Sequence, residues 1–218
     1  MAMNVAIDGP AGAGKSTIAK AIAKEKGYIY VDTGAMYRAM ALYFIRAGIA
    51  PDDEEKISGL VDDIDISIKY IDNAQHVILN DEDVTGFLRT EEVGNMASAT
   101  SVYGAVRTKL VSLQQKLAKT TDVIMDGRDI GTVVLPNANV KIFLTASVEC
   151  RAKRRFDELA AKGENPNLEK IAKDIEERDY RDSHRSISPL KQAEDAILLD
   201  TSDMTIEEVV AKIISYCE

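Results

Sequence analysis

The segment whose residue types most clearly indicate chemistry lies near the start of the 218-residue chain. We call it the phosphate loop (residues 9–16), and it consists of Gly9, Pro10, Ala11, Gly12, Ala13, Gly14, Lys15 and Ser16. The pattern G-x-x-x-x-G-K-S follows an apolar stretch and precedes a helix-like segment, as in triphosphate-binding loops. Because glycine lacks a Cβ, backbone N–H groups can turn inward around phosphate oxygens. Lys15 can reach the β- and γ-phosphates, and the Ser16 hydroxyl can bind Mg²⁺, so we predict a nucleoside triphosphate site.

A second apolar stretch ends in polar residues that suit the same chemistry. Residues 123–125 are apolar and run into Asp126, Gly127, Arg128 and Asp129. An aspartate at such a strand end can hold Mg²⁺ directly or through water, although aspartate also ends strands simply because it favours turns. The carboxyl ends of parallel strands meet at one edge of a sheet. We therefore expect Asp126, Arg128 and Asp129 to face the phosphate loop.

Two further polar residues follow the apolar stretch at residues 28–31. Thr33 has a hydroxyl that could contact a ligand or could serve as the N-cap of the next helix. Arg38 lies about one turn into that helix. We expect both residues to reach the same edge of the sheet as Asp126.

The elements that would position these residues alternate along the chain. Strand-length apolar runs occur at residues 5–7, 28–31, 123–125, 140–144 and 197–199. Most are followed by a turn signal and a segment of helical period, which predicts an α/β fold with a parallel sheet covered by helices on both faces. In the last helix, Thr205 and Glu208 form a capping-box pair. The apolar face of that helix is expected to comprise Ile206, Val209, Val210, Ile213 and Ile214.

Two segments depart from this alternation. Between about residues 60 and 83, apolar and polar residues alternate on either side of Asp72 and Asn73, which predicts a small antiparallel sheet with a turn. From about residue 151 to 185 the chain is rich in arginine and helical on either side of the loop signal at residues 163–166. In the second segment Arg178, Arg181 and Arg185 are about one helical turn apart, so we expect them to share a face.

Composition narrows the classes of protein that this chain can be. The formal net charge is −9, which argues against general nucleic-acid binding because that relies on a basic surface. No apolar run reaches the length of a membrane span, and no basic-then-apolar leader is present, so we expect a cytoplasmic protein with no membrane partner. Cys150 and Cys217 lack metal-ligand spacing and are interpreted as reduced structural thiols.

Taken together, the motifs resemble those of bacterial cytidylate kinases, and the resemblance extends over essentially the whole chain. The motifs are the phosphate loop with Thr17, Asp32-Thr33-Gly34-Ala35-Met36-Tyr37-Arg38, Asp126-Gly127-Arg128-Asp129-Ile130-Gly131-Thr132-Val133-Val134, and Glu177-Arg178-Asp179-Tyr180-Arg181-Asp182. We expect a monomer, and the resemblance implies one P-loop kinase domain over residues 1–218 with a five-stranded parallel sheet. Its parts would be a core (about 1–35, 105–150 and 186–218), a nucleoside monophosphate-binding region with the β insertion (about 36–104) and a lid (about 151–185).

The implied reaction is transfer of the γ-phosphate of ATP to CMP or dCMP, with Mg²⁺ as cofactor. From the residues themselves we expect catalysis by Lys15, Arg128, Arg178 and Arg185, ATP binding by residues 9–16, Thr17 and Arg154, which could stack on the adenine, and Mg²⁺ binding by Ser16 and Asp126. For CMP the resemblance assigns Thr33, Arg107 and Asp129 to the cytosine, Arg38, Arg128 and Arg185 to the phosphate, and Ser98, Arg178 and Asp182 to the sugar.

The residue chemistry is compatible with this reaction. The second pKa of a monophosphate is near 6, so its oxygens are nucleophilic at neutral pH without a general base. Several arginines and Mg²⁺ would cancel the repulsion between two phosphates. Two alternatives stay open at this point. One is a P-loop kinase for another small acceptor, such as another nucleotide or shikimate, and the other is a nucleotide-dependent switch.

Overall fold

The computed structural model describes residues 2–71 and 74–217. Two compact units make up the chain: Met1–Tyr30 with Thr121–Glu218, and Val31–Thr120. We refer to them as the first and the second unit. No helix among the described residues is both long and apolar enough to cross a membrane. The predicted turn at Asp72 and Asn73 lies outside the described residues.

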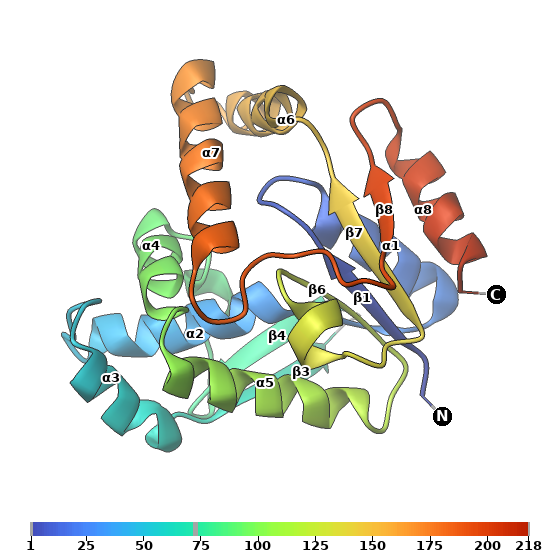
Figure 1. Ribbon diagram of the computed structural model, residues 1–218. Helices are drawn as coiled ribbons and strands as arrows, with labels where there is room; N and C mark the ends of the chain where they lie inside the picture. The colour runs from blue at the N-terminus through green and yellow to red at the C-terminus, as the bar shows by residue number, and fades with distance from the viewer. Residues whose placement is uncertain (1, 72–73, 218) are drawn as a thin grey trace. The chain divides into compact units, whose positions relative to one another are not determined.

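The first unit is built on a five-stranded sheet in the order β2-β6-β1-β7-β8 (Figure 1). The strands are β1 (Asn4–Asp8), β2 (Ile29–Asp32), β6 (Val123–Gly127), β7 (Val140–Thr145) and β8 (Ile197–Asp200). The chain passes into the second unit along β2. β1 pairs in parallel with both β6 and β7, and β7 pairs in parallel with β8. This confirms the predicted helix-covered parallel sheet and its five strands.

Helices α1 (Lys15–Lys26) and α8 (Ile206–Ser215) share one apolar core with the sheet. The capping box of Thr205 and Glu208 is present. Of the predicted apolar face of α8, all residues but the first are buried, while Ile206 is half exposed. The helical period indicates the direction of a side chain but not how far the core extends along the helix, and Ile206 is its first residue. The prediction was therefore wrong for Ile206.

The segment between β7 and β8 carries two packed helices, α6 (Val148–Ala161) and α7 (Leu168–His184). Figure 1 shows that α6 begins beyond the carboxyl end of β7. α7 ends at His184, and Arg185 follows with extended backbone angles (φ −64°, ψ 145°). The expectation that Arg178, Arg181 and Arg185 share one helical face was therefore wrong for Arg185, because a residue outside the helix does not follow its period.

The second unit contains the predicted antiparallel sheet. Its strands are β3 (Ile66–Ile71), β4 (Ala74–Leu79) and a short β5 (Glu82–Asp83), which the alternation pattern did not predict. The helices of this unit are α2 (Thr33–Arg46), α3 (Glu54–Leu60), α4 (Glu91–Thr100) and α5 (Gly104–Ala118). α2 packs against both α4 and β4. The predicted site residues Thr33 and Arg38 lie near the start of α2.

The first glycine of the phosphate loop has a role in the fold that can be tested. A Cβ on Gly9 would lie 1.9 Å from the carbonyl oxygen of Leu144 in β7, and the φ of Gly9 is +149°. We expect Gly9→Ala to lower the free energy of unfolding by clearly more than about 1 kcal/mol, measured by urea denaturation. Gly27→Ala is the control, since φ is +72° there but the described residues leave the Cβ position open. Equal losses in the two variants would show that the close approach to Leu144 does not matter.

Candidate active site

The phosphate loop connects the carboxyl end of β1 to the start of α1. Gly9, Gly12 and Gly14 all have positive φ angles, which other residues rarely adopt. Gly14 is the N-cap of α1 and has no side chain to bind the first N–H groups of the helix. The start of α1 therefore presents N–H groups and the positive end of the helix dipole to an anion.

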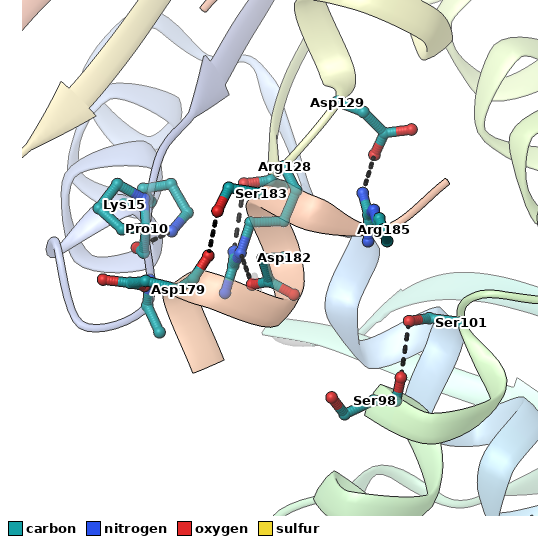
Figure 2. Close-up of polar contacts among 12 residues, drawn as sticks. Pro10, Lys15, Ser98, Ser101, Arg128, Asp129, Asp179, Asp182, Ser183 and Arg185 are labelled. Atoms are coloured by element: carbon teal, nitrogen blue, oxygen red, sulfur yellow. Dashed lines mark hydrogen bonds and ion pairs between the residues drawn. The ribbon is translucent and has the colours of Figure 1, made fainter. Parts of the chain in front are cut away.

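Lys15 lies buried against this loop, where its Nζ donates a hydrogen bond of 2.7 Å to the carbonyl oxygen of Pro10 (Figure 2). Burial holds the pKa of the Lys15 ammonium well below its usual range, and the positive charges of Arg128 and Arg178 lower it further. The carboxylates of Asp126 and Asp8 act in the opposite direction. Lys15 is buried, whereas Arg128 is half-buried and Arg178 is exposed. A bound anion would relieve the repulsion among these three cations, and a polyphosphate would supply one.

Ser16 and Asp126 lie next to each other, as the sequence predicted. The Ser16 hydroxyl donates to Oδ2 of Asp126 at 2.9 Å, and the Tyr30 hydroxyl donates to Oδ1 of Asp126 at 2.8 Å. The hydrogen bond from Tyr30 thus orients the Asp126 carboxylate. Sequence reasoning did not identify this contact. A hydroxyl and a carboxylate are the oxygen ligands that Mg²⁺ uses alongside water and substrate phosphates. The donor set at this position fits Mg²⁺.

Four predicted substrate-binding residues form two ion pairs between the turn after β6 and the end of α7 (Figure 2). Nε of Arg128 donates to Oδ2 of Asp182 at 2.7 Å, and Nη2 of Arg185 lies 3.6 Å from Oδ1 of Asp129. Burial alone would raise the pKa of Asp182, but the charges of Arg128, Arg178 and Arg185 more than offset it, so the pKa is lowered. Asp182 therefore stays ionised and available to a hydrogen-bond donor.

Asp8, at the end of β1, has a positioning role that sequence reasoning missed. Its buried carboxylate accepts hydrogen bonds from the backbone N–H groups of Ile130 (2.8 Å) and Gly131 (2.7 Å). These bonds hold the turn that carries Arg128 and Asp129. An aspartate directly before a phosphate loop and a strand ending in aspartate were both visible in the sequence. The sequence did not show, however, which backbone N–H groups Asp8 would bind.

In the second unit, Asp32 organises the start of α2. Its carboxylate accepts from the N–H of Ala35 at 2.8 Å, so Asp32, and not Thr33, is the N-cap. The suggested capping role of Thr33 was therefore wrong, because the strand ends one residue later than predicted and Thr33 is already helical. The same carboxylate pairs with Arg38 at 3.2 Å and with Arg89 at 2.8 Å. Sequence reasoning did not identify Arg89, which lies in no motif.

The other predicted residues of the second unit lie on α4 and α5. Nη1 of Arg107 donates to the carbonyl oxygen of Ser101 at 3.1 Å, and its guanidinium lies over the ring of Tyr37, 5.6 Å from the centroid. The carbonyl oxygen of Ser98 accepts from the Ser101 hydroxyl at 3.0 Å. These contacts tie the residues of α4, α5 and α2 together within the unit.

Arg154 of α6 contacts the loop after β8 and not the ion pairs. Its Nη2 donates to the carbonyl oxygen of Thr201 at 2.7 Å. Most predicted site residues of the first unit lie on the phosphate loop, at the end of β6 and the turn after it, or on α7 and directly after it: residues 9–17, Asp126, Arg128, Asp129, Arg178, Asp182 and Arg185. Arg154 stands apart on α6, bound to Thr201.

A phosphate loop lies between β1 and α1, an aspartate suited to Mg²⁺ lies at the end of the neighbouring β6, and arginines come from the segment after β7. These features define a P-loop kinase. A family model described as cytidylate kinase matches residues 5–218. The chain belongs to the cytidylate kinase family.

Individual relatives agree with this family. The chain is 54% identical to a cytidylate kinase of Leuconostoc mesenteroides, covering 98% of this chain and 96% of the relative. It is 56% identical to a cytidylate kinase of Lactobacillus johnsonii, covering 97% and 92%. Among solved structures, an uncharacterized protein from Eubacterium ventriosum has a similar fold, with a TM-score of 0.57 and 12% identity over 100% of this chain and 98% of that one.

The ionisation of Asp8 makes the stability of the folded protein depend on pH. Burial raises the pKa of Asp8 from 3.8 to about 6, against the opposing effect of its two backbone hydrogen bonds. The folded protein therefore binds this proton more tightly than the unfolded chain does. The stability contributed by Asp8 is full below its ordinary pKa and is lost as the pH rises through about 6.

We expect the free energy of unfolding of the wild type, relative to that of Asp8→Asn, to fall by about 3 kcal/mol between roughly pH 3.5 and pH 7. Urea denaturation of both proteins at each pH measures this difference, in which the groups common to both proteins largely cancel. A difference that is constant with pH, or that grows as the pH rises, would contradict the raised pKa.

Proposed function

We propose that the protein transfers the γ-phosphate of ATP to CMP or dCMP, giving ADP and CDP or dCDP. The observation that carries this proposal is the pair of arginine–aspartate contacts beside the phosphate loop, Arg128 with Asp182 and Arg185 with Asp129. Arginines there suit a nucleotide phosphate, and the carboxylates suit the sugar hydroxyls and the amino group of the base. The cytidylate kinase names of relatives 54% and 56% identical to this chain support the same reaction.

For ATP, the backbone of residues 9–17 would surround the phosphates. Lys15, whose ammonium is held close to the loop by Pro10, would bind the β- and γ-phosphates. Arg154 would lie against the adenine. Ser16 and Asp126 would hold Mg²⁺, which when bound neutralises charge on the transferred phosphoryl group. Asp126 is already oriented toward Ser16 by its second hydrogen bond to Tyr30.

For CMP, each group of the substrate has its own proposed set of residues. The cytosine set is Thr33, Arg107 and Asp129, the phosphate set is Arg38, Arg128 and Arg185, and the sugar set is Ser98, Arg178 and Asp182. No side chain needs to remove a proton, because the monophosphate is already largely ionised at neutral pH. Lys15, Arg128, Arg178 and Arg185 would stabilise the charge that develops during transfer, which is the main catalytic requirement of phosphoryl transfer. The proposed setting is a cytoplasmic monomer.

The reaction is tested by measuring ADP formation from ATP and Mg²⁺ with a panel of acceptors: CMP, dCMP, UMP, AMP, GMP, shikimate and none. We expect turnover mainly with CMP and dCMP. A preference for another acceptor would keep the triphosphate site but reject the cytosine assignment. Slow hydrolysis of ATP without any acceptor preference would favour a nucleotide-dependent switch.

Base selection by Asp129 is tested separately with Asp129→Asn. Cytosine offers an amino donor where uracil has an oxygen, and a buried carboxylate facing an oxygen would be left unpaired. We expect the variant to lose on the order of 10²-fold in its preference for CMP over UMP, with the KM for ATP nearly unchanged. Asp157→Asn, which removes an exposed carboxylate on α6, is the control. Steady-state constants for CMP equal to those of the control would reject the role of Asp129.

A further inference from the structure

Arg151, in the first turn of α6, is a buried cation outside the substrate sets described above. Its Nε donates to the carbonyl oxygen of Ala146 at 2.9 Å, which ties it to the end of β7. Its Nη1 donates to the carbonyl oxygen of Ala11 in the phosphate loop, also at 2.9 Å. A Cβ added to Gly12 would lie 3.4 Å from the Cβ of Arg151, so the side chain also packs against the loop.

Asp179, on α7, completes this arrangement. Its Oδ2 accepts from Nη1 of Arg151 at 2.6 Å, and its Oδ1 accepts from the backbone N–H of Ala11 at 3.2 Å. Both backbone polar groups of Ala11 are thus bound by two side chains that are also bound to each other. Figure 2 shows Asp179 beside the phosphate loop, with Lys15 and Pro10 on the loop itself. We call Ala11, Arg151 and Asp179 the clasp.

The position of the clasp on α7 links it to the proposed chemistry. Asp179 directly follows Arg178 and lies one helical turn before Asp182, which binds Arg128. The positive charge of Arg178 lowers the pKa of Lys15 in the phosphate loop. Because α7 is a continuous helix, fixing Asp179 against Ala11 also fixes where Arg178 and Asp182 stand relative to the loop.

Simple stabilisation is a weak account of this contact. A buried ion pair costs desolvation that its own attraction often fails to repay, so it is poor evidence for stability alone. A carboxylate that binds one backbone N–H and one guanidinium does, however, define a single geometry. Phosphoryl transfer depends strongly on such geometry, because displacement of a catalytic group by about 1 Å can cost roughly 10²-fold in rate.

We propose that Asp179 and Arg151 are positioning residues that lock α7 to the phosphate loop, and so place Arg178 and Asp182 for phosphoryl transfer without touching the substrates themselves. The kinetic part of this proposal rests on the proposed function of the protein. The clasp itself does not.

The kinetic test compares Asp179→Asn with Glu177→Gln. The second variant removes the same charge from an exposed position two residues away on α7, where Glu177 lies 3.9 Å from Lys173. We expect Asp179→Asn to lower kcat about 10- to 100-fold with the KM for ATP within about threefold of the wild type, and Glu177→Gln to leave both unchanged. A kcat within about threefold of the wild type would overturn the proposal. A rise in the KM for ATP as large as the fall in kcat would also overturn it, because Asp179 would then act as a substrate ligand.

Two more variants keep the test decisive if Asp179→Asn does not fold. Asp179→Glu keeps the charge but lengthens the side chain, so we expect it to lose about tenfold or more in kcat as well. Full activity of the Glu variant would show that only the charge matters and would overturn the proposal. Arg151→Lys keeps the charge but cannot reach all three acceptors. We then combine Asp179→Glu with Arg151→Lys. We expect the kcat of this double variant to be no more than about threefold below that of the worse single variant, whereas multiplicative losses would show that the two residues act independently.

Hydrogen exchange of the ligand-free protein tests the clasp without any assay of catalysis. We expect Asp179→Asn to speed exchange at the N–H of Ala11 and along α7, with the sheet amides unchanged, and Glu177→Gln to have no such effect. If exchange at Ala11 does not change, the clasp is not formed in solution. If wild-type protein shows the protected amide but does not phosphorylate CMP, the proposed function fails while the clasp stands.

Discussion

The accumulation of positive charge at the carboxyl end of the central sheet is the constraint on which the rest of this structure depends. Lys15 is buried, and Arg128 and Arg178 lie close enough to lower its pKa further. Water cannot fully solvate the buried Lys15 ammonium, so the protein must supply compensating groups until a polyphosphate binds. Much of the polar architecture of the first unit provides this compensation.

The compensating carboxylates also determine where the cations stand. Asp182 binds Arg128, Asp129 lies beside Arg185, and Asp179 binds Arg151. Asp8 does not bind an arginine but holds the backbone turn from which Arg128 and Asp129 extend. In the second unit, Asp32 forms ion pairs with both Arg38 and Arg89. The three arginines of the proposed phosphate set, Arg38, Arg128 and Arg185, are thus each held beside an aspartate, which lowers the entropy that ligand binding would have to remove.

Much of the fold could be predicted because its signals are local. The strands, the antiparallel insertion and the capping box of Thr205 with Glu208 each arise from residues within a few positions of one another. Where prediction failed, a boundary was involved. Asp32 capped α2 in place of Thr33, Arg185 fell just beyond α7, and Ile206 lay at the end of its helix. Helix and strand ends depend on the competition of neighbouring caps and packing, which a periodic pattern does not describe.

The sequence by itself determined the kind of loop, the order of strands and helices, and the end of the sheet at which Lys15, Ser16 and Asp126 would meet. Glycine spacing and strand-end residues carry that information directly. Only the tertiary structure decided which distant group each carboxylate binds. Ala11 meets Asp179 across 168 positions, and Asp8 meets Ile130 and Gly131 across 122 and 123. A chain with 36 acidic and 27 basic residues allows many such pairings, and their choice depends on how helices and strands pack in three dimensions.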